Sequence, residues 1–127
     1  MFKHILVPTD GSASAEKAFR AALAFARETG AAITGYHAIA PQSAAAAGDG
    51  YLFPRLSNGV GNPLHAMQEA AGAAGVRFAV LVNEAADLAD GLAAAMRASA
   101  CDVVFIATHA VSPGVLASAS VPVMAYR

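Results

Sequence analysis

The chain has 127 residues, 57 % of them apolar with 34 alanines among these, and a formal net charge of −1. Its length suits a single domain spanning residues 1–127, and its eight basic residues form no block that would attract nucleic acid or an anionic membrane. No apolar run approaches the roughly 18 residues that cross a bilayer, and no secretion signal is visible, so we expect a cytoplasmic protein.

Apolar runs of strand length alternate with longer helical patterns along the chain. Residues 2–8 predict a first strand because three consecutive aliphatic residues at its centre are typical of strands buried on both faces of a parallel sheet. A turn over residues 9–12 follows. Either Ser12 or Ser14 can cap the next helix, whose apolar residues repeat at helical spacing until Gly30.

The second predicted strand spans residues 32–40. Residues 41–62 are rich in glycine, proline and alanine. This composition predicts a long, exposed and flexible loop rather than a packed element. Asn62 and Pro63 then supply a helix cap and a first-turn proline, and Gly75 ends that helix.

The remaining sequence repeats the pattern, with a third strand over residues 76–83, a helix over 86–100 and a fourth strand over 103–108. A short connection leads to a fifth strand over residues 121–126. Alternating strands and helices predict an α/β fold with helices on both faces of a mainly parallel sheet. Ligands of such sheets bind beyond the carboxyl ends of the strands, so we expect the site in the loops after strands one, two and four.

Two segments carry a family resemblance. Residues 5–12 (Ile-Leu-Val-Pro-Thr-Asp-Gly-Ser) closely resemble the opening signature of the universal stress protein family. Residues 102–110 (Asp-Val-Val-Phe-Ile-Ala-Thr-His-Ala) resemble its fourth strand and the Gly-Ser-His-Gly that follows, residues 121–124 (Val-Pro-Val-Met) its last strand, and His37 a second-strand histidine. The resemblance implies an open five-stranded parallel sheet in the order 3-2-1-4-5, with helices on both faces. Members of the family are usually dimeric.

Many members of that family bind ATP in a cleft between strands one and four. The resemblance matches Asp10 to the aspartate that contacts the nucleoside, and Pro8 and Thr9 to the backbone beside the base. The full set of cleft positions that it implies is Pro8, Thr9, Asp10, Ala40, Ala107, Thr108, His109 and Ser112.

The phosphate-binding half of the family motif is altered in this sequence. Its Gly-x-x-Gly falls on Ala107 and Ala110, and residues 110–120 leave no room for the whole phosphate loop, so we expect a fold shortened after strand four. Glycine lets backbone N–H groups approach a phosphate, whereas alanine adds a Cβ and Pro113 removes an N–H. We therefore expect weak or absent ATP binding. The alternative is that ATP or AMP binds beside Asp10 with altered phosphate contacts.

Catalytic and metal-binding patterns are missing from the sequence. No Gly-rich lysine motif, paired carboxylates or nucleophile elbow accompanies the fold, which favours a non-enzymatic binding or signalling module in stress response over a nucleotide hydrolase or transferase. Four scattered histidines and one cysteine predict neither a metal site nor a disulfide, with Cys101 a buried apolar residue. The segment from Asp10 to Ser12 also fits a simple capped turn.

The last strand predicts an interface. A terminal apolar strand at a sheet edge promotes aggregation unless it is covered, and the family covers it with the same strand of a second subunit. We expect a two-fold homodimer through Val121, Val123, Met124 and Tyr126.

Overall fold

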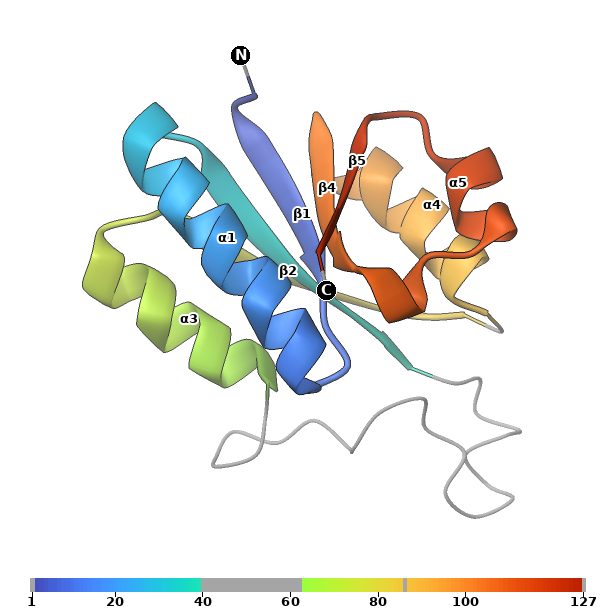
Figure 1. The fold of residues 1–127 in the computed structure, drawn as a ribbon, viewed down its shortest axis with the longest axis horizontal. Helices are drawn as coiled ribbons and strands as arrows, with labels where there is room; N and C mark the ends of the chain where they lie inside the picture. The colour runs from blue at the N-terminus through green and yellow to red at the C-terminus, as the bar shows by residue number, and fades with distance from the viewer. Residues whose placement is uncertain (1, 40–62, 86, 127) are drawn as a thin grey trace.

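Strands and helices alternate along the chain and build a three-layer arrangement, shown in Figure 1 as a computed structural model that describes residues 2–39, 63–85 and 87–126. The five strands form one parallel sheet in the order β3-β2-β1-β4-β5, which confirms the predicted fold class and strand order. The elements are β1 (His4–Pro8), α1 (Ala13–Thr29), β2 (Ala32–Ile39), α3 (Pro63–Ala74), β3 (Phe78–Glu84), α4 (Leu88–Ser99), β4 (Val103–Ala107), the 3-10 turn η1 (Thr108–Ala110), α5 (Pro113–Ser118) and β5 (Val123–Tyr126).

Helices cover both faces of this sheet. Helices α1 and α3 lie on one face, and α4 and α5 lie on the other (Figure 1). Because side chains alternate along a strand, Ile5 and Val7 of β1 pack toward α1 and α3, whereas Leu6 packs toward α4. All three are fully buried, as expected for a central parallel strand.

Local hydrogen bonds fix the ends of the first helix. Ser12, rather than Ser14, caps α1, because its Oγ accepts from the backbone N of Ala15 at 3.1 Å. Gly30 ends the helix in the left-handed conformation, with φ of 78°. The carboxylate of Asp102 then joins the start of β4 to β1 by accepting from the backbone N of Lys3 and of His4 at 2.8 and 3.0 Å.

Four predicted starts are wrong by two residues, because β1 begins at His4, β3 at Phe78, α4 at Leu88 and β5 at Val123. The connection between β4 and β5, which was predicted only to be short, contains the six-residue helix α5. Ser112 and Pro113 supply the cap and first-turn proline that start it. The predicted loop over residues 41–62 lies outside the described residues.

No helix in the described ranges is long and apolar enough to span a membrane, since even α1 has 17 residues.

Candidate functional site

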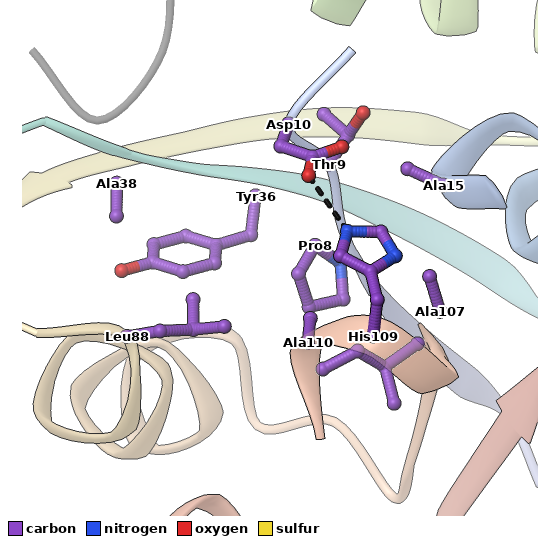
Figure 2. Close-up of a pocket in the computed structure, with 11 residues that line it drawn as sticks. Pro8, Thr9, Asp10, Ala15, Tyr36, Ala38, Leu88, Ala107, His109 and Ala110 are labelled. Carbon is purple, nitrogen blue, oxygen red and sulfur yellow. Dashed lines mark hydrogen bonds and ion pairs between the residues drawn. The ribbon is translucent and has the colours of Figure 1, made fainter. Parts of the chain in front are cut away.

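A cavity of about 230 Å³ opens at the carboxyl ends of β1, β2 and β4 (Figure 2). This is the edge of the sheet where the sequence places the site. The volume lies below the range of about 300–1,000 Å³ that is typical of small-molecule pockets. The lining residues are Pro8, Thr9, Asp10, Ala15, Tyr36, Ala38, Leu88, Ile106, Ala107, His109 and Ala110.

The structure brings together most of the expected cleft residues. Those that line the cavity are Pro8, Thr9, Asp10, Ala107 and His109. Two others do not line it: Thr108 is exposed in η1, and the hydroxyl of Ser112 caps α5 by accepting from the backbone N of Val115 at 3.1 Å. Ala40 lies outside the described residues.

Asp10 and His109 meet across the mouth of the cavity. Oδ2 of Asp10 lies 2.8 Å from Nε2 of His109, and Oδ1 accepts from the backbone N of Ser12, also at 2.8 Å. Burial opposes ionisation of Asp10, but the hydrogen bonds from Ser12 and His109 outweigh it and lower the pKa of the carboxyl. Asp10 is therefore an ionised acceptor at neutral pH, and Nε2–H of His109 donates to it.

The turn that carries Asp10 is held by its own side chains. Oγ1 of Thr9 accepts from the backbone N of Gly11 at 3.1 Å, and Gly11 adopts the left-handed conformation with φ of 78°. The backbone N of Thr9 donates to the carbonyl of Tyr36 at 2.9 Å, which ties the turn to β2. The residues that form the capped turn before α1 are thus the same residues that the sequence places in the candidate site.

Tyr36 and Leu88 line the cavity although the sequence did not point to them (Figure 2). Tyr36 is fully buried, and its hydroxyl donates to Oδ1 of Asn83 at 2.6 Å, while Nδ2 of Asn83 donates to the carbonyl of Gly91 at 3.1 Å. Burial raises the pKa of Tyr36 to about 12, against the opposing effect of the Asn83 bond. A tyrosine within a buried strand needs a partner for its hydroxyl, and this requirement is the signal that marks Tyr36.

The cavity is apolar apart from its mouth. Among the described residues that line it, none is a lysine or an arginine, and Asp10 carries the single carboxylate. Ala107 and Ala110, at the positions of the family's two glycines, both line the cavity. Among the described residues, no three histidine, cysteine or acidic side chains gather as a metal site.

Two other residues singled out in the sequence lie away from this cavity. Cys101 is buried, as expected, and its burial raises the pKa of the thiol. His37 is 1 % exposed, and burial lowers its pKa to about 4. Alternation along β2 directs His37 to the face opposite Tyr36 and Ala38, both of which line the cavity.

A second, larger cavity of about 380 Å³ lies between α1 and α3, on the other side of the turn after β1. Thr9 and Ala15 line both cavities. The lining residues of the second cavity are Thr9, Gly11, Ser12, Ala15, Glu16, Phe19, Arg20, Leu23, Pro63, Ala66, Met67 and Ala70.

The family model described as the universal stress protein family matches residues 1–127. A search of curated proteins gives no match.

Solved structures of the same family share the fold. A universal stress protein family member from Burkholderia pseudomallei is 23 % identical, with a TM-score of 0.73 over 97 % of this chain and 94 % of its own. A universal stress protein in complex with cAMP is 21 % identical, with a TM-score of 0.73 over 99 % and 97 % of the two chains. The universal stress protein from Archaeoglobus fulgidus in complex with dAMP is 16 % identical, with a TM-score of 0.70 over 98 % of each chain.

Proposed function

The chain belongs to the universal stress protein family, and from that premise we propose that it is a non-enzymatic, dimeric binding or signalling module of the stress response that binds ATP weakly or not at all. The observation that carries this proposal is the cavity beside Asp10. It has about 230 Å³, apolar walls and no lysine or arginine among its lining residues.

A triphosphate finds little to bind it at this site. Phosphates are usually held by backbone N–H groups converging at a helix start, often with a basic side chain. Here Ala107 and Ala110 place methyl groups in the cavity wall, and Pro113 at the start of α5 has no N–H to donate. The ionised carboxylate of Asp10 also repels an anionic ligand.

Adenine nucleotide binding is the second candidate function. The solved relatives in complex with cAMP and with dAMP favour it, and so does the position of Asp10 at the cavity mouth. In this alternative, AMP or ATP enters beside Asp10, and its phosphates extend into solvent.

Calorimetric titration with ATP, AMP and adenosine separates the two candidates. We expect affinity to rise as phosphates are removed, with adenosine binding at least tenfold more tightly than ATP, because each phosphate adds charge without adding a partner. Micromolar binding of ATP would contradict the leading proposal and support the alternative. Replacing Asp10 with Ala serves as the control, since it removes the carboxylate at the mouth and should weaken nucleoside binding.

The proposed dimer uses the edge strand β5. Its expected interface residues are Val121, Val123, Met124 and Tyr126, of which Met124 is 43 % exposed. An exposed methionine on an edge strand is the feature that a pairing subunit would cover. A cytoplasmic location is part of the same proposal.

A further inference from the structure

The outer carboxylate oxygen of Asp10 is already bonded within the protein. Nε2 of His109, which is 99 residues further along the chain, lies 2.8 Å from Oδ2. Oδ1 accepts a hydrogen bond from the backbone N of Ser12. The two partners come from opposite sides of the opening, because Asp10 follows β1 and His109 lies in η1 after β4 (Figure 2). The imidazole therefore occupies one of the two carboxylate oxygens that Asp10 offers at the mouth.

The interior of the cavity and its mouth suit different parts of a ligand. Apolar side chains and the ring of Tyr36 form the interior walls, and the hydroxyl of Tyr36 is committed to Asn83. A flat ring can pack against these apolar walls, and a sugar attached to that ring would then lie at the polar mouth. There it meets Asp10 and His109, whose side chains are 29 % and 48 % exposed.

We propose that His109 is a specificity-determining residue of this cavity, which competes with ligand hydroxyl groups for Oδ2 of Asp10. The cavity then favours a flat, uncharged heterocycle without hydroxyl donors over the corresponding nucleoside, which must displace the imidazole before it can bond to Asp10. This inference rests on the proposed function, and specifically on its expectation that the cavity binds adenosine more tightly than ATP.

The competition is modest in size. Partly exposed ion pairs are weak, so release of Oδ2 from His109 corresponds to a gain of about three- to fivefold in nucleoside affinity. Adenosine and 9-methyladenine are suitable probes, because they share the ring, and 9-methyladenine carries a methyl group in place of the ribose and its hydroxyl groups. His109→Ala frees Oδ2, whereas His109→Gln keeps an N–H donor on a side chain that can still reach it.

Calorimetry with both probes tests the proposal on the full chain. We expect His109→Ala to bind adenosine about three- to fivefold more tightly than the parent, with 9-methyladenine changed less than twofold and His109→Gln close to the parent. The adenosine gain should vanish when Asp10→Ala is combined with His109→Ala. Thermal unfolding of each variant confirms that these surface changes leave the fold intact.

Three outcomes would overturn the inference. Weaker adenosine binding by His109→Ala would make His109 a ligand contact, and equal gains for both probes would make it a steric obstacle. If neither probe binds to the parent or to any variant, the cavity does not accept this class of ligand. That last result leaves weak ATP binding standing, whereas tight ATP binding by the parent would instead refute the proposed function.

Discussion

His109 should influence the ionisation of Asp10 directly. Although burial raises the pKa of Asp10, hydrogen bonds from Ser12 and His109 lower it overall. We expect His109→Ala to raise the pKa of this carboxyl, because the variant removes one hydrogen bond and a nearby positive charge. An NMR titration of the Asp10 carboxyl carbon measures the shift. Ser12→Ala is the matched comparison, since it removes the hydrogen bond from the Ser12 hydroxyl that also lowers this pKa and keeps the bond from the Ser12 backbone N. An unchanged pKa in His109→Ala would show that the pair does not persist in solution.

The buried imidazole of His37 should make stability depend on pH. Its pKa is lowered from 6.5 to about 4 by burial, so between these values the unfolded chain binds a proton that the folded chain does not. The free energy of unfolding therefore falls as the pH decreases from 6.5 toward 4. For His37 this amounts to about 2 kcal/mol between pH 7 and pH 5.

Urea denaturation at pH 7 and pH 5 measures this contribution. The variant His37→Gln lacks the titrating group, so we expect it to lose less stability than the parent over the same interval. Burial also lowers the pKa of His4, which contributes with the same sign in both proteins. Equal losses in parent and variant would assign the pH dependence to groups other than His37.

Individual site residues were predictable where the contact is local. The turn from Thr9 to Ser12 follows from short-range hydrogen bonding of threonine, aspartate and serine, which neighbouring residues determine. The predicted strand order placed Asp10 and His109 in one cleft, but their hydrogen bond was not predicted, because it depends on the course of η1 after β4. Tyr36 was assigned only to a strand, since its place in the cavity depends on which face of the sheet α4 covers.

Helix α4 approaches β2 closely at Gly91. A Cβ added there would collide with the hydroxyl of Tyr36 and lie 2.7 Å from Cβ of Ala85. We expect Gly91→Ala to lower the free energy of unfolding by about 1–3 kcal/mol, because the helix or the tyrosine must move. The change would also disturb the bond between Tyr36 and Asn83 in the cavity wall.

Gly72 provides the matched control for this substitution. It lies in α3, is exposed, and a Cβ there would meet nothing within 4 Å. Gly72→Ala should therefore raise stability by about 0.5–1 kcal/mol through the helix preference for alanine. Chemical denaturation compares the two variants, and a stable Gly91→Ala protein would mean that α4 shifts without cost.

The elements themselves followed from apolar periodicity, but some of their ends did not. Val76 is apolar and buried, as a strand residue would be, yet its backbone N donates to the carbonyl of Ala71 and so completes the end of α3. Pro122 has no N–H for the ladder, and β5 begins after it. The apolar pattern predicts which residues are buried. The ends of these elements depend instead on which carbonyl accepts from each backbone N–H.

At the scale of the whole molecule, three of the four exposed large apolar side chains among the described residues lie on the edge strands of the sheet, and the fourth, Leu116, lies in α5. Val80 and Val82 lie on β3, and Met124 lies on β5 at the opposite edge. If β5 pairs with its copy, Met124→Lys should yield a monomer, because two lysines would face each other across the interface. Light scattering after size-exclusion chromatography measures the mass.

Val80→Lys is the control at the other edge. Val80 is 47 % exposed and Met124 43 %, so a lysine is accommodated equally well at either position in a single subunit. We expect Val80→Lys to remain dimeric. A parent protein that is monomeric, or a dimer disrupted only by Val80→Lys, would contradict pairing through β5.

The architecture of the whole chain was the most predictable feature. A parallel sheet in the order 3-2-1-4-5 follows from the alternation of buried strands and helices together with the family resemblance, and the structure confirms it. The content of the connection after β4 was less predictable. Six residues from Pro113 to Ser118 form a helix there because Ser112 caps them, a local effect that the apolar pattern does not report.

The two cavities are separated by little more than one turn of chain. Thr9 lines both of them, with Gly11 and Ser12 facing the space between α1 and α3 and Asp10 facing the space at the ends of β1 and β4. This turn therefore separates two cavities that lie on opposite faces of the sheet. Because Thr9 belongs to the wall of each cavity, a substitution at this one position would alter the lining of both.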